Sequence, residues 1–181
     1  MFFGSDLRRL RLVDCARVSD DGLIEIAPRL YLLEELQLCH CKLSTEVVQA
    51  FGDGCPQLES FRLNYPRGSG FDEYALPIAK SMPQLRHLHL FGNKLTKDGL
   101  RTILDGCTRL ESLDLRQCSY LFLDADLLKR CADAGIKKLR LPKDSIDDYE
   151  YDVESLDDEE DDDGSDDDFS DDSDLQSSDE E

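Results

Sequence analysis

The chain lacks any apolar run close to the roughly 20 residues needed to cross a bilayer, although it is 181 residues long. This absence excludes a membrane-spanning helix. Its first residues also lack the charged, apolar and small-residue regions of a signal peptide. The seven cysteines are odd in number, and without an export signal we expect reduced thiols. These features predict a protein of the nucleus or cytoplasm.

Basic residues are missing from the end of the sequence. Residues 144–181 hold 22 of the 41 acidic residues and none of the 21 lysines and arginines. So much like charge with so little apolar surface predicts a disordered acidic tail. Residues 1–143, with 19 acidic and 21 basic residues, are expected to form the folded domain.

The acidic tail also contains candidate modification sites. A serine followed three positions later by an acidic residue, a pattern similar to acidophilic kinase sites, occurs at Ser155, Ser165, Ser177 and Ser178. Phosphorylation there would deepen the negative charge. A purely solubilising extension is the alternative.

Catalytic and cofactor motifs are absent as well. No glycine-rich phosphate-binding motif occurs, and no pattern places a base beside an exposed cysteine. His87, His89 and the run Cys39-His40-Cys41 contain metal-ligand types, but structural zinc needs four convergent ligands and the usual CxxC spacing is missing. We therefore expect no enzyme and no metal or cofactor site.

What the sequence does contain is a repeat. The frame LxxLxL recurs at intervals of 25 to 27 residues, at Leu7-Leu10-Leu12, Leu33-Leu36-Leu38, Leu58-Phe61-Leu63, Leu85-Leu88-Leu90, Leu110-Leu113-Leu115 and Ile136-Leu139-Leu141. The alternating last pair of each frame predicts a short strand with one buried face. Three positions later, where a small buried side chain can contact backbone groups exposed by a turn, stand Cys15, Cys41, Pro66, Asn93 and Cys118.

Helices are expected between these strands. Ser19, Ser44 and Thr96 stand at N-cap positions before apolar residues at helical spacing. Glycines follow the helical runs, where a left-handed closing residue is commonly required, at Gly54, Gly106 and Gly135. Stacked units of strand, turn and helix place parallel strands on a concave face and helices on a convex one.

The third unit departs from this pattern. Residues 65–70 replace a tight turn, and Pro77 falls inside the expected helix. Because proline removes a helical hydrogen bond beyond the first turn, we predict a longer loop and a late or broken helix. The loop is either a recognition loop on the rim or an insertion tolerated at the surface.

The frame Cys-x-x-Leu-x-x-Leu-x-Leu-x-x-Cys is complete at residues 107–118 and partial at residues 55–66. It resembles the cysteine-containing class of leucine-rich repeats, and the resemblance covers residues 7–142. In that family such repeats usually form the substrate-recruiting half of F-box proteins, particularly the plant F-box/LRR-repeat proteins. The resemblance implies an α/β leucine-rich-repeat solenoid over residues 1–143, a short horseshoe of about six strand-turn-helix repeats.

The F-box of that family is a helical motif of a few tens of residues ahead of the repeats. Only Met1–Asp6 precede the first frame here, so we do not expect an F-box in this chain. The chain is then either a fragment or a repeat protein that lacks this motif. A Skp-type adaptor and a cullin ligase are expected as partners only if a longer form carries an F-box.

If the frame leucines point inward, the intervening strand residues form three rows on the concave face. The first row is Arg9, Glu35, Ser60, His87, Ser112 and Lys138; the second is Arg11, Gln37, Arg62, His89, Asp114 and Arg140; the third is Val13, Cys39, Asn64, Phe91, Arg116 and Pro142. Six bases against two acids predict an electropositive surface.

An exposed aromatic with histidines and arginines on a rigid sheet resembles a protein-binding hot spot. Ordinary solvated strand residues are the alternative. The candidate protein-binding residues are Arg11, Arg62, His87, His89, Phe91, Asp114, Arg116 and Arg140. We expect a protein target on this face and no nucleic acid.

Two functions fit the sequence. The first, implied by the resemblance, is substrate recognition for an SCF-type ubiquitin ligase in protein degradation. The second is a free-standing acidic regulator that binds basic proteins such as histones. The tail favours the second function, whereas repeats of 25 to 27 residues with cysteine at the turn are unlike the shorter, asparagine-type units of such regulators.

Overall fold

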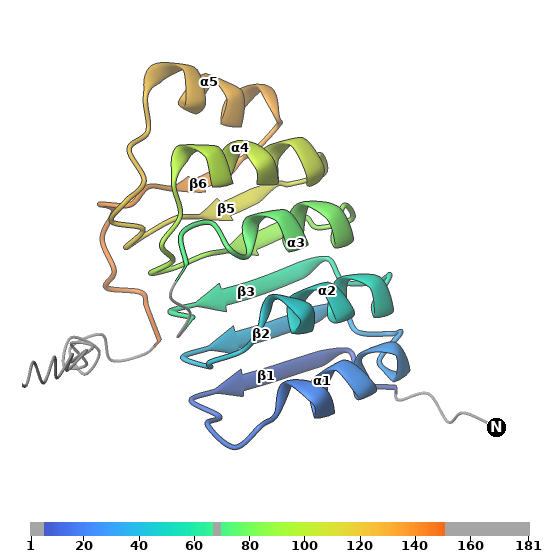
Figure 1. The fold of residues 1–181 in the computed structure, drawn as a ribbon. Coiled ribbons are helices and arrows are strands. Elements are labelled where there is room, and N and C mark those ends of the chain that lie inside the picture. Colours follow the sequence, from blue (N-terminus) through green and yellow to red (C-terminus); the bar gives the residue numbers. More distant parts are fainter. Residues whose placement is uncertain (1–5, 67–69, 151–181) are drawn as a thin grey trace, which may run out of the picture. The chain divides into compact units, whose positions relative to one another are not determined.

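The computed structural model describes residues 6–66 and 70–150, in which strands and helices alternate (Figure 1). The strands are β1 (Arg9–Val13), β2 (Glu35–Cys39), β3 (Ser60–Asn64), β4 (His87–His89), β5 (Ser112–Asp114) and β6 (Lys138–Arg140). The helices are α1 (Asp20–Ile26), the 3-10 helix η1 (Ala27–Arg29), α2 (Thr45–Gly54), α3 (Ala75–Ser81), α4 (Lys97–Gly106) and α5 (Ala125–Asp133). The strands form one parallel sheet in chain order, and the helices stack along one side of it (Figure 1).

The register of the sheet aligns the repeated frame from strand to strand. The middle residue of each frame pairs with that of the next, in the series Leu10, Leu36, Phe61, Leu88, Leu113 and Leu139. Because side chains alternate across a strand, the paired frame residues share one face of the sheet. This arrangement confirms the predicted leucine-rich-repeat solenoid.

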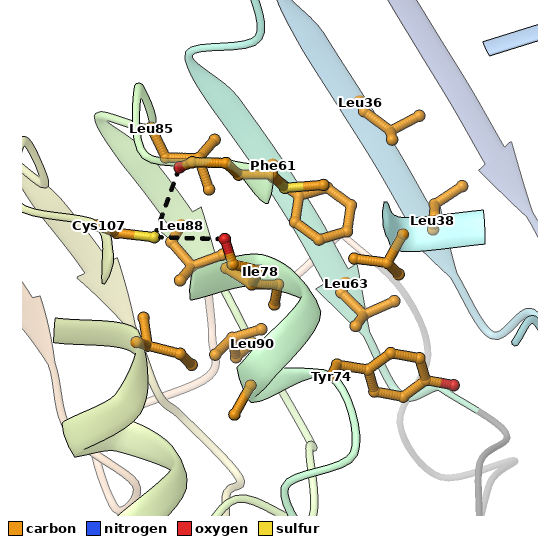
Figure 2. Packing of buried hydrophobic residues seen from close by; sticks show 14 of the residues in the cluster. Leu36, Leu38, Phe61, Leu63, Tyr74, Ile78, Leu85, Leu88, Leu90 and Cys107 are labelled. Atoms are coloured by element: carbon orange, nitrogen blue, oxygen red, sulfur yellow. Dashed lines mark hydrogen bonds between the residues drawn. The ribbon is translucent and has the colours of Figure 1, made fainter. Parts of the chain in front are cut away.

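The hydrophobic core lies between the sheet and the helices. Figure 2 shows its centre, where Phe61 and Leu88 of neighbouring strands belong to the same cluster as Ile78 of α3. All three side chains are fully buried. The period of two in the strands and the helical spacing of apolar residues thus meet in one continuous core.

The turn after each of the first five strands contains a residue with a left-handed backbone. The φ angles are 49°, 55°, 44°, 69° and 60° at Asp14, His40, Tyr65, Gly92 and Gln117. The N–H of each donates to a carbonyl of the next repeat, as from Gly92 to Arg116 at 3.0 Å. Gly92 must lack a side chain, because a Cβ there would lie 2.4 Å from the Tyr65 ring. The sheet ladder therefore continues into the turn.

Three positions after the frame, the first, second, fourth and fifth repeats carry a side-chain donor, whereas the third repeat has Pro66. Sγ of Cys118 donates to the carbonyl of Leu90 at 3.0 Å, and Nδ2 of Asn93 donates to the carbonyl of Leu63 at 2.6 Å. In both pairs the acceptor belongs to the preceding repeat. These contacts confirm that a small polar or thiol side chain satisfies backbone groups near the turn.

The predicted N-caps are in place, and two of them are joined to the preceding repeat. Ser19 Oγ accepts from the N–H of Gly22 at 3.3 Å. Thr96 Oγ1 accepts from Asp98, while its own N–H donates to Asp72 Oδ1 at 2.6 Å. Ser44 makes no side-chain cap bond, but its N–H donates to a carboxylate of the first repeat, that of Asp20, at 3.0 Å.

Of the three glycines predicted to close helices, Gly135 has a positive φ of 80°. The prediction was wrong for Gly54 and Gly106, which are the last residues of α2 and α4 and do not have a positive φ. A Cβ on Gly106 would lie 2.2 Å from the carbonyl oxygen of Ala79, and one on Gly54 would lie 2.9 Å from the carbonyl carbon of Ala27. These glycines allow close approach between repeats.

Replacing Gly106 by alanine is expected to lower the free energy of unfolding by about 1–3 kcal/mol, because the added methyl overlaps the backbone of α3. This cost exceeds the roughly 1 kcal/mol by which alanine is favoured over glycine inside a helix. Thermal unfolding followed by circular dichroism measures the change. Arg101→Ala, at an exposed position of the same helix, is the control, and a Gly106→Ala variant as stable as wild type would contradict the explanation.

The third repeat has the late helix that was predicted. α3 begins at Ala75 and has 7 residues, against 10 in α2 and α4. Pro77 lies in its first turn, where the missing N–H costs little. Residues 67–69 of the preceding loop lie outside the described residues.

The compact unit extends to Ile146, and a second unit begins at Asp147. Of the second unit, residues 147–150 are described and form turns and bends. The predicted disordered tail beyond them, with Ser155, Ser165, Ser177 and Ser178, lies outside the described residues. Within the described ranges, no helix has the length and apolar character to span a membrane.

Candidate functional site

The predicted concave rows are aligned across the sheet, but their exposure changes along the strands. In the first row Arg9, His87 and Lys138 are exposed. The second row is mixed, with Arg11 and Arg140 exposed, Arg62 and His89 half-buried, and Gln37 and Asp114 buried. In the third row Cys39, Asn64, Phe91 and Arg116 are buried. Accessible side chains therefore lie over the first two rows.

Three of the predicted binding residues are not accessible. Phe91 is 1% exposed, and Asp114 and Arg116 are each 5% exposed, so the prediction of an exposed aromatic on this face was wrong. The physical reason is that these side chains contact one another and the neighbouring turns. Phe91, Asp114 and Arg116 form a buried layer at the carboxyl ends of the strands, which we call the wall.

Planar side chains of successive repeats stack on one another along the wall. The rings of His40 and Tyr65 are stacked with centroids 5.3 Å apart, and Tyr65 meets Phe91 at 5.5 Å with a tilt of 55°. The guanidinium carbon of Arg116 lies 5.2 Å from the centre of the Phe91 ring, a cation–π distance. We call these four residues the stacked ladder. It ties four consecutive repeats together.

Every nitrogen of the Arg116 guanidinium has a partner. Nε and Nη2 donate to the carboxylate of Asp114 at 2.8 to 3.2 Å, a forked geometry that suits arginine. Nη1 donates to the carbonyl of Ser145 at 2.9 Å. The segment after β6 is thereby held to the stacked ladder.

Asp114 is charged despite its burial. Burial alone would raise the pKa of its carboxyl, but hydrogen bonds from His89 and Arg116 outweigh burial and hold the pKa well below its usual value. His89 Nδ1 lies 3.6 Å from Asp114 Oδ2. The negative charge of Asp114 is therefore offset inside the wall.

The acids of the three rows are each beside an arginine of the same face. Arg9 Nε lies 3.6 Å from Glu35 Oε2, and Asp114 is paired with Arg116. We call the basic side chains of the first two rows the cationic surface: Arg9, Arg11, Arg62, Lys138 and Arg140. The three rows together hold six bases and two acids.

The residues just before the strands carry balanced charge. Arg8 is paired with Glu34, and Glu111 accepts hydrogen bonds from Arg86 and Lys137. Hydrogen bonds from Lys137 and Arg86 lower the pKa of Glu111 to about 2. This border therefore adds little net charge to the face.

The two candidate histidines are engaged in the sheet. His87 Nδ1 lies 2.9 Å from Ser112 Oγ on the adjacent strand, and His89 contacts Asp114. Within residues 6–66 and 70–150, no group of three or more His, Cys, Asp or Glu residues could hold a metal ion. The arrangement is suited to hydrogen bonding and charge recognition.

All seven cysteines are free thiols. Burial raises the pKa of Cys55 to about 11 and those of Cys107 and Cys118 to about 12. Burial raises the pKa of Cys39 and Cys41 as well. These five thiols stay protonated at neutral pH, which suits packing and weak hydrogen bonding rather than nucleophilic attack.

Several exposed aromatic side chains lie elsewhere, in the loops that follow β3 and β5. Phe71 and Tyr120 are 56% and 52% exposed, and their rings meet edge to face with centroids 4.8 Å apart. Phe122 is also exposed. Sequence reasoning missed this pair because its members are 49 positions apart in irregular segments, away from the strand rows.

The chain is similar to known leucine-rich-repeat proteins. The family model described as "Leucine Rich repeat" matches residues 5–27 and 81–104. Putative F-box/LRR-repeat protein 23 of Arabidopsis thaliana is 47% identical over 148 residues, which cover 79% of this chain and 33% of that protein. F-box protein SKIP19 of the same plant is 44% identical over 154 residues, covering 85% of this chain and 50% of that protein.

A third relative, putative F-box/LRR-repeat protein 22 of Arabidopsis thaliana, is 43% identical over 153 residues, covering 83% of this chain and 49% of the relative. The chain thus spans between a third and a half of the length of these relatives. The aligned frames and parallel sheet agree with the matches. The chain therefore has the leucine-rich-repeat fold and is similar, over most of its length, to part of the plant F-box/LRR-repeat proteins.

Proposed function

We propose that this chain recognises a target protein through its concave strand face, as the substrate-binding part of an F-box/LRR-repeat protein. In this proposal an F-box in a longer form binds a Skp-type adaptor, and the bound target is degraded through an SCF-type ubiquitin ligase in the nucleus or cytoplasm. The similarity to F-box/LRR-repeat proteins supports the ligase assignment.

One observation supports the concave face above all. Six parallel strands hold the accessible side chains of the first two rows at fixed spacing, about 4.8 Å from strand to strand. The stacked ladder and the Arg116–Asp114 pair hold one edge of these rows rigid. A preorganised surface loses little conformational entropy on binding, which favours recognition.

A capture experiment with steric variants tests the proposal. The tagged chain is expressed in plant cells, crosslinked, and its partners are quantified by mass spectrometry. Ser60→Trp, on β3 in the first row, is expected to reduce partner recovery about tenfold by filling the centre of the face. Lys129→Trp, at an exposed position of α5 on the helix side, is the matched control and should leave recovery unchanged.

A separate measurement, the half-life of a captured partner, tests the ligase assignment. The F-box segment of SKIP19 is fused ahead of the chain, and the half-life of a captured partner is followed with and without a proteasome inhibitor. We expect a shorter half-life that the inhibitor restores and that Ser60→Trp abolishes. Recovery that is indifferent to Ser60→Trp would refute the concave face, and an unchanged half-life would refute the ligase role.

The acidic tail supports a second candidate, a regulator that binds basic proteins such as histones. Its 22 acidic residues without a lysine or arginine provide the charge for this function. The same capture separates the candidates. Histones retained by Ser60→Trp but lost on deletion of residues 147–181 would favour the regulator.

A further inference from the structure

We propose that Ser145 is phosphorylated by an acidophilic serine kinase, and that the phosphate loosens the segment that follows β6. We call this segment, residues 141–146, the strap. The proposal concerns a modification of the chain and does not depend on what the concave face binds. It rests on the sequence around Ser145, on the exposure of this residue and on the hydrogen bonds that hold the strap.

The sequence pattern of the four tail serines also occurs at Ser145. Asp147 stands two positions after Ser145, and Asp148 stands three positions after it. The other serines that the structure describes lack an acidic residue at the third position: Ser19, Ser44, Ser60, Ser81, Ser112 and Ser119. Within the described ranges, Ser145 is therefore the serine that matches the pattern.

The place of Ser145 in the fold suits access by a kinase. Ser145 is exposed, and residues 141–150 form neither a helix nor a strand. The compact unit ends one residue later, at Ile146. A kinase acts on a short segment of its substrate, and segments with few buried contacts open locally at small cost in free energy. The residues around Ser145 meet this requirement.

The strap is attached at Ser145 and at the residue before it. Arg116 Nη1 donates to the carbonyl of Ser145 at 2.9 Å. Asp144 Oδ2 accepts a hydrogen bond from the N–H of Leu141 at 2.8 Å, which closes the start of the strap. A new charge on Ser145 therefore falls at the point where the strap is held.

The modification is a phosphoryl transfer from ATP. The Oγ of Ser145 attacks the γ-phosphorus, so that an O–P bond forms while the bond to the bridging oxygen of the β-phosphate breaks and ADP leaves. The hydroxyl proton goes to the catalytic aspartate of the kinase. The resulting phosphoserine carries about 1.5 to 2 negative charges at neutral pH.

Acidic residues outnumber basic ones beside Ser145. Asp144 precedes it and Asp147 and Asp148 follow it, whereas the basic residue of the strap is Lys143. A phosphate placed next to carboxylates is repelled by them. The phosphate therefore weakens the hydrogen bond that the carboxylate of Asp144 accepts within the strap.

Arg116 does not offset this repulsion. Its Nε and Nη2 donate to the carboxylate of Asp114, and its side chain is 6% exposed. A phosphate that bound Arg116 would have to displace Asp114 or enter the buried wall, at a cost in desolvation. We therefore expect the phosphate to remain in solvent and the strap to open more often.

Phosphorylation of the full chain in vitro tests the site. The substrate is a variant in which alanine replaces the tail serines at positions 155, 165, 170, 173, 177 and 178. It is incubated with ATP and a recombinant acidophilic serine kinase, whose activity is confirmed on a standard acidic peptide. We expect intact-mass spectrometry to show about one phosphate per chain, and fragmentation to place it on Ser145.

Three further changes to this substrate serve as controls. Ser145→Ala should abolish the signal. Asp148→Asn should lower the rate of phosphorylation about tenfold, because it removes a charge-assisted contact with the kinase, whereas Asp147→Asn should lower the rate less than about threefold. Absence of phosphate on Ser145 while the standard peptide is modified would overturn the assignment, as would an unchanged rate for Asp148→Asn.

Amide hydrogen exchange followed by NMR tests the loosening. In the phosphorylated chain the N–H of Leu141 should exchange about tenfold faster than in the unmodified chain, since the Asp144 carboxylate holds it less often. The N–H of Leu90, which donates to the carbonyl of Asp114 at 2.9 Å, is the control and should keep its rate. Unchanged or slower exchange at Leu141 would overturn the loosening, even where Ser145 is phosphorylated.

Discussion

Replacing Leu88 by alanine is expected to lower the free energy of unfolding by about 2–5 kcal/mol. Leu88 is 0% exposed and lies on β4, within the cluster that joins the sheet to α3 and α4. Removal of its branched end loses apolar burial and leaves a cavity that the paired strands on both sides prevent from collapsing. A loss this large is a substantial part of the stability of a small domain.

Denaturant unfolding measures the change, and Leu76→Ala provides the matched control. Leu76 is also a leucine in a repeat of this solenoid, but half of its side chain is exposed on α3. Its replacement should change the free energy of unfolding by less than about 1 kcal/mol. Equal stability of Leu88→Ala and wild type would place Leu88 outside the core.

Replacing Arg116 by alanine is expected to cost about 3–5 kcal/mol at neutral pH, because it leaves the buried carboxylate of Asp114 without its partner. The variant also loses the contact with the Phe91 ring and the hydrogen bond to Ser145. The double variant Asp114→Leu with Arg116→Met should recover much of the loss, since it removes both charges. Full loss in the double variant would mean that the ring and Ser145 contacts dominate.

The pH dependence of stability gives this prediction a second readout. The pKa of Asp114 is lower in the folded state than in the unfolded chain, where it is about 4. Its contribution to stability is therefore complete above pH about 4 and is lost as the pH falls toward the folded pKa. In the double variant without Asp114 and Arg116, this part of the acid destabilisation should be absent when unfolding is measured as a function of pH.

The repeat architecture could be predicted because its signals are local and recur. Leu88, Leu113 and their equivalents stand at the same place in each frame, and one register explains them all. Ser19 and Thr96 mark helix starts through hydrogen bonds to residues two or three positions away. Local chemistry of this kind is visible in a sequence.

The form of the wall could not be predicted, because it depends on contacts between different positions of successive repeats. His40 and Tyr65 stand one position further along the repeat frame than Phe91 and Arg116 do, so an alignment by rows separates the members of the stacked ladder. The burial of Phe91 follows from these contacts. Gly106 was misread for a related reason, since its constraint comes from Ala79 in the preceding helix.

The bonds between repeats also bear on how the solenoid loses its structure. Asp72 accepts a hydrogen bond from the N–H of Thr96, the N-cap of α4, and Cys118 donates to the carbonyl of Leu90, just after β4. Each repeat thus completes the one beside it. In a linear array with such nearest-neighbour coupling, unfolding proceeds by fraying from the ends, where a repeat has one neighbour instead of two. Leu139 of β6 is only partly buried, whereas Leu88 is fully buried. Protection of backbone amides against hydrogen exchange is therefore graded along the chain, greatest in the central strands and least at the last described repeat.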